Sequence, residues 1–242
     1  MFNFDKRILY VILAIMVIAN IATRLNSKDG LLITLVTLPA ILIAITFHEF
    51  AHAFAADKLG DDTPRSQGRL TLNPLAHLDP VGTIMLLFAH FGWGKPVEVN
   101  PRNYDRRMSM EKADAIVSIA GPLMNFLLAI VFVIIYCIIL KFINVQSQVG
   151  LIIMLMIQLI IQINIGLGVF NLFPIPPLDG SKVIKPFLPQ NIKIWFETNG
   201  QLFEMVFVAL WIFGILGQIV SPIIGTIYKG IMNLGFAIFG IL

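Results

Sequence analysis

Two histidines and a glutamate stand within five residues of one another, near the end of a long apolar run. They read His48-Glu49-Phe50-Ala51-His52. On a helix, residues i and i+4 share a face, so His48 and His52 can bind one metal ion, and two imidazoles suit zinc. Glu49 can then act as the general base for a water molecule beside that ion. The pattern predicts metal-assisted hydrolysis.

The depth of this pattern in the apolar run adds weight to the prediction. Counted back from Asp57 at about 1.5 Å per helical residue, His52 lies about 7 Å and His48 about 13 Å inside the run. Ionisable side chains at that depth in a membrane are costly and usually mark a functional site. The alternative is a helix end with polar side chains that snorkel to the interface, but Glu and His side chains are too short for this.

A catalytic zinc ion needs a third protein ligand and keeps one position open. A later apolar run ends at 174–177, which holds three prolines in four positions and cannot continue an α-helix. Irregular backbone at membrane depth is tolerated where it is buried in protein or lines a wet cavity. Asp179, next to the permissive Gly180, is therefore the predicted third ligand. The alternative is an ordinary loop aspartate that caps the following turn.

The composition is that of a membrane protein. Of the 242 residues, 57% are hydrophobic and 13% are charged, whereas a soluble domain is nearer half apolar and a quarter charged. The mean hydropathy is +0.86. The net charge of +3 comes from basic residues scattered near the ends of the apolar runs, so the expected partner is the lipid bilayer and not nucleic acid. The single cysteine, Cys137, cannot form an internal disulfide and is interpreted as a small lipid-facing or packing residue.

The expected fold is an all-α polytopic membrane protein with about six transmembrane helices. A span needs about 20 apolar residues. The chain is interpreted as one transmembrane domain, 1–242, with a catalytic core at about 31–200 and a first span that is retained and not cleaved as a signal peptide. The predicted spans are 8–23, 31–56, 114–140, 149–173, 203–220 and 223–242.

The basic residues predict the orientation of these spans. Most of the 17 Lys and Arg residues fall in the N-terminal segment and in the loops 57–112 and 174–202. Six alternating spans place these three regions on one side of the membrane. The positive-inside rule therefore places both termini and the active-site loops in the cytoplasm.

The run 81–92 is too short and too rich in glycine for a normal span, and is expected to be a re-entrant or interfacial element. Gly92-Trp93-Gly94, followed by alternation at 97–99, predicts a hairpin or an exposed strand edge, which gives the fold a small re-entrant β element. Such an edge can hold an unwound substrate segment by strand addition. The alternative is a plain membrane-anchoring loop.

Together, the motifs at 48–52 and 171–180 resemble the site-2 protease family of intramembrane zinc metalloproteases, as do 68–74 and 121–125. The resemblance covers most of the chain. Without an inserted PDZ-like or cystathionine-synthase-like domain, the chain is similar to the compact bacterial or archaeal subgroup. The resemblance implies one Zn²⁺ per chain, with His48, His52 and Asp179 as ligands and Glu49 as the catalytic base. Asn171 matches the family's motif asparagine, which holds substrate or the transition state near the metal.

The resemblance also implies the activity: a zinc-dependent intramembrane endopeptidase that uses metal-activated water. Its substrates would be single-span membrane proteins, cut in or near their transmembrane segments, in a prokaryotic plasma membrane. Gly92, Trp93 and Gly94 resemble part of the family's re-entrant hairpin and are further substrate-binding candidates. Asn125 has two interpretations, helix packing or lining of the active site.

The alternatives to proteolysis are a membrane metal transporter and a scaffold that has lost its activity. A membrane metal transporter needs further intramembrane ligands along a path, but His77 and His90 lie in the loop region. His77 and Asp79 could form a second metal site, although an interfacial turn with local hydrogen bonds is favoured. A scaffold that has lost its activity is disfavoured because every catalytic position is intact.

Overall fold

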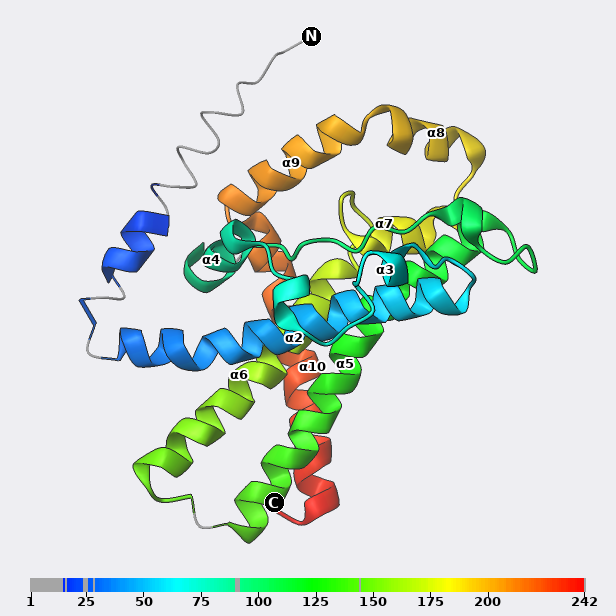
Figure 1. The fold of residues 1–242 in the computed structure, drawn as a ribbon. Helices are drawn as coiled ribbons and strands as arrows, with labels where there is room; N and C mark the ends of the chain where they lie inside the picture. Colours follow the sequence, from blue (N-terminus) through cyan, green and yellow to red (C-terminus); the bar gives the residue numbers. More distant parts are fainter. Residues whose placement is uncertain are drawn as a thin grey trace.

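The computed structural model describes residues 15, 17–23, 26–27, 29–89, 92–143 and 145–241. Three short 3₁₀ turns, Pro74–Ala76, Pro101–Asn103 and Lys185–Phe187, lie between the α-helices. The helices are coloured along the chain in Figure 1 and are α2 (Gly30–Lys58), α3 (Thr63–Ser66), α4 (Pro80–Ala89), α5 (Met110–Phe142), α6 (Gln148–Asn171), α7 (Asp179–Ile184), α8 (Gln190–Thr198), α9 (Gly200–Ile212) and α10 (Ile215–Phe239).

Within the described residues, four helices are long and apolar enough to cross a membrane: α2, α5, α6 and α10. This agrees with the predicted all-α membrane class, but it does not confirm the count of six spans. Most of the predicted span 8–23 lies outside the described residues, although 17–23 are helical. The predicted spans 31–56, 114–140 and 149–173 correspond to α2, α5 and α6.

The predicted spans 203–220 and 223–242 divide the C-terminal region at the wrong place. The break falls at Phe213 and Gly214, whose φ of 70° is left-handed, and α10 continues straight through Pro222. The 13 residues of α9 span only about 20 Å, which is less than the apolar thickness of a bilayer. Thus α9 and α10 do not make two full crossings.

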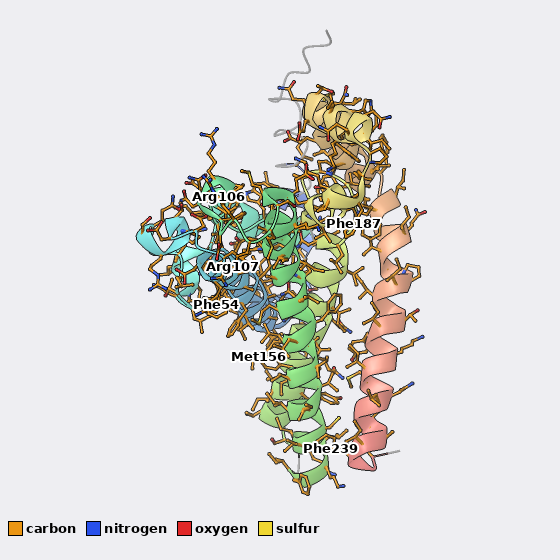
Figure 2. All side chains as sticks on the ribbon, turned by 90° about the vertical axis from the view of Figure 1, so that its right-hand side faces the viewer. Phe54, Arg106, Arg107, Met156, Phe187 and Phe239 are labelled. Atoms are coloured by element: carbon orange, nitrogen blue, oxygen red, sulfur yellow. The ribbon has the colours of Figure 1, made fainter. Side chains whose placement is uncertain are left out.

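The uninterrupted helix α10 carries the chain to the far end of α5. The end of α10 lies beside the end of α5, where Lys141 Nζ donates a hydrogen bond to the Phe239 carbonyl at 2.5 Å (Figure 1). Figure 2 shows Phe239 at this end of α5, whereas Arg106 and Arg107 of the basic loop lie toward the other end. The described end of α10 therefore lies at the opposite end of α5 from the basic loops, whereas the predicted topology placed both on one side. The cytoplasmic orientation of these ends stays a prediction.

Helices α5, α6 and α10 run side by side, whereas α2 crosses them (Figures 1 and 2). Their shared core includes Val133 and Cys137 of α5, Ile161 of α6 and Met232 of α10. A Cβ at Gly235 would lie 2.7 Å from the Val133 side chain, so this glycine lets α10 approach α5 closely. The fully buried Cys137 lies at the same contact, so of its two interpretations the structure favours the packing residue over the lipid-facing one.

The predicted element at 81–92 is mostly helical. Helix α4 has ten residues, too few for a span, and packs its Leu87 against Ile41 and Ile45 of α2. A β element is not confirmed: the β pairing found in the described part of the chain is one isolated antiparallel bridge between Leu78 and Gly94. Residues 95–100 follow this bridge without regular secondary structure.

Candidate metal centre

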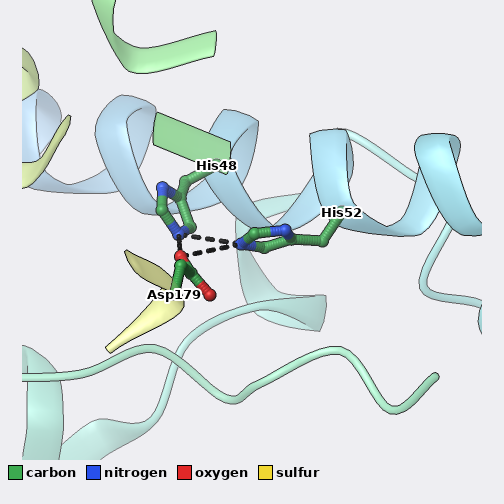
Figure 3. Close-up of side chains that lie close together, drawn as sticks. All are labelled: His48, His52 and Asp179. Atoms are coloured by element: carbon green, nitrogen blue, oxygen red, sulfur yellow. Dashed lines mark hydrogen bonds and ion pairs between the residues drawn. The ribbon is translucent and has the colours of Figure 1, made fainter. Parts of the chain in front are cut away.

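Helix α2 places two imidazoles on one face, as the i, i+4 spacing predicts. His48 and His52 are buried, and their Nε2 atoms lie 3.0 Å apart. Asp179, the first residue of α7, points its carboxylate at both rings (Figure 3). Its Oδ2 lies 3.2 Å from His48 Nε2 and 3.3 Å from His52 Nε2. The structure therefore brings together the three residues predicted as metal ligands.

The spacing of these three atoms suits zinc. Donors at about 2.0–2.1 Å from a tetrahedral ion lie about 3.3 Å from one another. The three measured separations, 3.0, 3.2 and 3.3 Å, come close to this triangle. A fourth, open position on a zinc ion held by this triangle would be the position that hydrolytic chemistry requires.

The hydrogen bonds of the two rings show that the triangle consists of acceptors. His52 Nδ1 lies 2.7 Å from the Val117 carbonyl, which can only accept, so Nδ1 carries the hydrogen. His48 Nδ1 likewise donates to Asn125 Oδ1 at 2.6 Å. Each Nε2 then presents a lone pair toward the other and toward the Asp179 carboxylate. Three acceptors at this distance repel one another unless a cation lies among them, so the donor set fits a metal ion.

One face of α5 holds both rings in place. Val117, Gly121 and Asn125 follow one another at intervals of four, so they form a single stripe on the helix. A Cβ at Gly121 would lie 2.4 Å from His52 Nε2 and 2.7 Å from His48 Nε2. The missing side chain at position 121 therefore makes the space that the two imidazoles occupy.

The broken backbone after α6 brings Asp179 to α2. Leu178 has extended backbone (ψ 154°) at the start of α7, and the segment 172–178 folds back on itself. A Cβ at Gly180 would lie 2.2 Å from the Leu172 carbonyl oxygen. The small residue at 180 thus permits this close return of the chain. The break in the helix agrees with the irregular backbone predicted from the prolines.

Glu49, the predicted base, lies beside the two histidines on α2 and faces the segment after α4. Its Oε2 accepts a hydrogen bond from the Val97 amide at 2.9 Å. A Cβ at Gly94 would lie 2.7 Å from Ile45 Cγ2 and 3.6 Å from Glu49 Oε1. The chain at 94–97 therefore passes directly over the base.

Arg69 fixes this segment and was not identified from the sequence. Its buried guanidinium donates to the carbonyls of Ala76, Lys95 and Pro96, the last at 2.9 Å. The Lys95 amide in turn donates to the His77 carbonyl at 2.7 Å. The sequence signal for Arg69 is its place in the stretch 68–74, which carries part of the family resemblance.

His77 and Asp79 have local roles. Burial lowers the pKa of His77, and its Nε2 lies 2.7 Å from the Thr71 carbonyl. Asp79 accepts from the Gly82 amide at 2.7 Å and so caps the first turn of α4. Among the described residues, the convergent metal-type cluster is His48, His52 and Asp179. The favoured interpretation, a turn with local hydrogen bonds, agrees with these contacts.

The remaining predicted site residues lie at different distances from the centre. Asn125 contacts His48 directly, and Gly94 lies close to Glu49. Gly92 and Trp93 pack their backbone against Gly82 in α4, where a Cβ on Gly92 would meet the Gly82 carbonyl at 2.0 Å. The Asn171 side chain donates to the Leu167 carbonyl of its own helix at 3.0 Å.

An apolar cavity of about 460 Å³ opens next to the site. It begins one turn before His48 on α2 and extends between α4, α6 and α10. Its lining includes Ala44, Ile45, Gly92, Leu167, Trp211 and Val220. The cavity therefore lies among these helices, one turn before the two histidines on α2.

Comparison with known proteins gives related sequences. A Bacillus subtilis protein named "Putative zinc metalloprotease YwhC" is 36% identical over 200 residues, which cover 82% of this chain and 90% of that protein. A Mycobacterium tuberculosis H37Rv protein named "Putative zinc metalloprotease Rip2" is 29% identical over 72% of this chain and 69% of that protein. The Mycolicibacterium smegmatis protein of the same name is 31% identical over 61% of this chain and 55% of that protein. No family model and no solved structure matches the chain.

The relatives and the geometry lead to the same chemistry. The YwhC similarity covers 82% of this chain and 90% of that protein, and four helices are apolar enough to cross a membrane. A donor set suited to zinc joins one of these helices, α2, which carries His48 and His52, to Asp179 of α7. The chain is an integral membrane zinc metalloprotease and belongs to the site-2 protease family.

Proposed function

We propose that this protein is an intramembrane endopeptidase that hydrolyses peptide bonds in or near the transmembrane segments of single-span membrane proteins. In this proposal His48, His52 and Asp179 hold one zinc ion, and Glu49 is the general base. The observation that carries the proposal is the convergence of three acceptor atoms on a membrane-type helix, within 3.3 Å of one another and next to a carboxylate.

The chemistry needs a Lewis acid and a base. Zinc in such a site polarises a peptide carbonyl and makes water a stronger nucleophile at neutral pH. Glu49 takes the proton from the attacking water and delivers it to the leaving amine. The Val97 amide, which donates to Glu49 Oε2 at 2.9 Å, holds this carboxylate in one orientation.

Substrate binding is assigned to the surfaces around Glu49. The apolar cavity beside Ala44, Ile45 and Gly92 suits a hydrophobic peptide segment. We also assign Gly94 to substrate contact, because its backbone packs close to Glu49. We assign Asn171 to the reacting carbonyl, as a hydrogen-bond donor that stabilises the developing negative charge.

The proposed location is a prokaryotic plasma membrane, with the loops around the site in the cytoplasm. The loops 57–112 and 174–202 carry most of the basic residues. Both lie at the end of the bundle where α5 begins and α6 ends. The positive-inside rule supports a cytoplasmic position for that end.

The test uses Glu49→Gln in lipid vesicles that contain a panel of purified single-span membrane proteins. New peptide termini are identified by mass spectrometry, and zinc per chain is measured in parallel. We expect the parent to cut within or beside the spans, and the variant to lose about 10²–10⁴-fold in rate while it retains zinc. Activity of the variant at the parental rate would exclude Glu49 as the base.

A water-soluble unfolded protein, β-casein, serves as the comparison substrate. Cleavage of casein by a parent enzyme that leaves every membrane span intact would contradict the intramembrane part of the proposal. It would leave the zinc protease assignment unchanged.

A further inference from the structure

Two asparagines are fully buried between helices of the bundle, behind the metal centre. Asn125 lies in α5 and Asn164 in α6, each with no solvent exposure. A buried amide without partners costs free energy, and both side chains find partners in each other and in nearby carbonyls. Asn164 touches none of the three proposed metal ligands through a described contact, so its place in this pair needs an explanation.

A backbone carbonyl fixes the orientation of the Asn164 side-chain amide. Asn164 Nδ2 donates to the Ile160 carbonyl at 2.8 Å. A carbonyl can only accept, so the nitrogen of the Asn164 amide must face it, and Oδ1 must face the other way. That oxygen accepts from Asn125 Nδ2 at 2.9 Å.

The second amide is oriented by the first. Asn125 Nδ2 donates both to Asn164 Oδ1 and to the Ala44 carbonyl, the latter at 3.0 Å. Two acceptors therefore fix the nitrogen side of Asn125, and its Oδ1 is left to accept from His48 Nδ1 at 2.6 Å. With the hydrogen on Nδ1, His48 Nε2 carries the lone pair that a metal ion needs.

We propose that Asn164 is a positioning residue of the metal centre, which fixes the tautomer of His48 through Asn125 and so sets the affinity for zinc. The proposal rests on the assignment of His48 as a zinc ligand. Without the Asn164 oxygen, one N–H of Asn125 loses its acceptor, and only the Ala44 carbonyl still favours the present orientation of the amide over the turned one. The turned amide donates to His48 Nδ1, which moves the ring hydrogen to Nε2, where it opposes the metal.

The test is the zinc affinity of the full-length, detergent-purified protein, measured by chelator competition. Asn164→Leu keeps a similar volume but removes the acceptor. We expect zinc to bind about 10–100-fold more weakly, as is usual when the partner of a ligating histidine is lost. The matched control is Gln158→Leu, because Gln158 Nε2 donates to the Tyr136 hydroxyl at 2.9 Å between the same two helices. The control should bind zinc like the parent.

A second variant separates positioning from simple packing. In Asn125→Asp, either carboxyl oxygen can accept from His48 Nδ1, and the other oxygen, when protonated, donates to the Ala44 carbonyl in place of the amide nitrogen. Adding Asn125→Asp to Asn164→Leu should therefore restore most of the lost affinity. A loss caused only by a destabilised helix pair would not be reversed by this change.

Two results would overturn the inference alone. One is unchanged zinc affinity in Asn164→Leu, and the other is an equal loss in Gln158→Leu, each with zinc bound by the parent. Failure of the double variant to recover affinity would also contradict it. A parent protein that binds no zinc would overturn the inference together with the proposed function.

Discussion

At the scale of single residues, the metal centre depends on an absent side chain as much as on the side chains present. His48 and His52 lie against Gly121, where even one methyl group would be within 2.7 Å of both rings. Only glycine at position 121 therefore leaves room for the two imidazole rings. Helix packing and metal geometry are set at the same position in α5.

Gly121→Ala tests this dependence. The added Cβ would lie 2.4 Å from His52 Nε2, so the rings must move and zinc affinity should fall by at least about tenfold, while the helices remain folded. Zinc per chain and helical circular dichroism are measured together. Gly225→Ala is the control, since a Cβ there meets no atom within 4 Å. Full zinc binding by the Gly121 variant would show that the rings can relocate freely.

The sequence predicted the residues whose relationship is local or chemically unusual. His48 and His52 are joined by helical spacing, and Asp179 stood out because prolines break an apolar run. The partnership of Asn125 with Asn164 could not be predicted, since it depends on which faces of two distant helices meet. Arg69 was missed for a similar reason: its partners are backbone carbonyls, which leave no mark on the sequence.

At the scale of elements, the polar loop after α2 is tied down by one buried aspartate. Asp61 accepts hydrogen bonds from the Thr63 backbone and hydroxyl, from the Asn100 amide at 2.6 Å and from the Asn103 side chain at 3.0 Å. Burial by itself would raise the pKa of Asp61, but these hydrogen bonds outweigh it and hold the pKa below its usual value. The ionised form therefore stabilises the fold.

Asp61→Asn should lower the free energy of unfolding by about 2 kcal/mol at pH 7, because an amide nitrogen replaces one of the accepting oxygens. A depressed pKa contributes stability above the ordinary aspartate pKa of about 4, and this contribution disappears as the pH falls through the pKa of the folded state. The difference in melting temperature between parent and variant should therefore shrink as the pH is lowered from 7 through 4 and below. A difference that stays constant with pH would contradict this role for the charge.

The contacts of this loop explain why the β element was overpredicted. The alternation at 97–99 is typical of a strand, but a strand needs a neighbouring backbone to pair with. Here the Lys95 amide donates to the His77 carbonyl, but further hydrogen bonds of the backbone of 95–100 go to side chains, namely Arg69, Glu49 and Asp61. Side-chain partners at separated positions hold the segment extended without a sheet, which a periodic pattern cannot reveal.

At the scale of the whole molecule, the centre joins parts that would otherwise be held together mainly by apolar contacts. α2 crosses α5 and α6, and α7 follows a break in the backbone (Figure 1). Ligands from α2 and α7 converge on one point, and each ring is also bound to α5. Metal binding should therefore stabilise the fold as a unit.

Zinc removal measures this coupling. An ion that binds only the folded state stabilises it by about 2.7 kcal/mol at a concentration 100 times its Kd. We expect a chelator to lower the melting temperature of the detergent-solubilised parent, and added zinc to restore it. His48→Ala should melt at one temperature with or without chelator. An equal effect of chelator on both proteins would mean that the stabilising ion binds elsewhere.

The number of crossings was predicted less well than the centre, because hydropathy does not show where an apolar helix turns. A left-handed glycine at 214 separates α9 from α10, whereas Pro222 lies inside α10 without ending it. Here a glycine separates the two helices and a proline does not, which is opposite to the usual expectation that proline ends a helix.

The order of the ligands along the chain has a consequence for biosynthesis. His48 and His52 are translated before α5 and α6, and Asp179 is translated after them, so the third ligand does not exist until the sequences of both helices have been made. Until then the nascent chain carries Glu49 with an incomplete donor set. The hydrolytic chemistry that needs all three ligands is therefore not available to the nascent chain before that point.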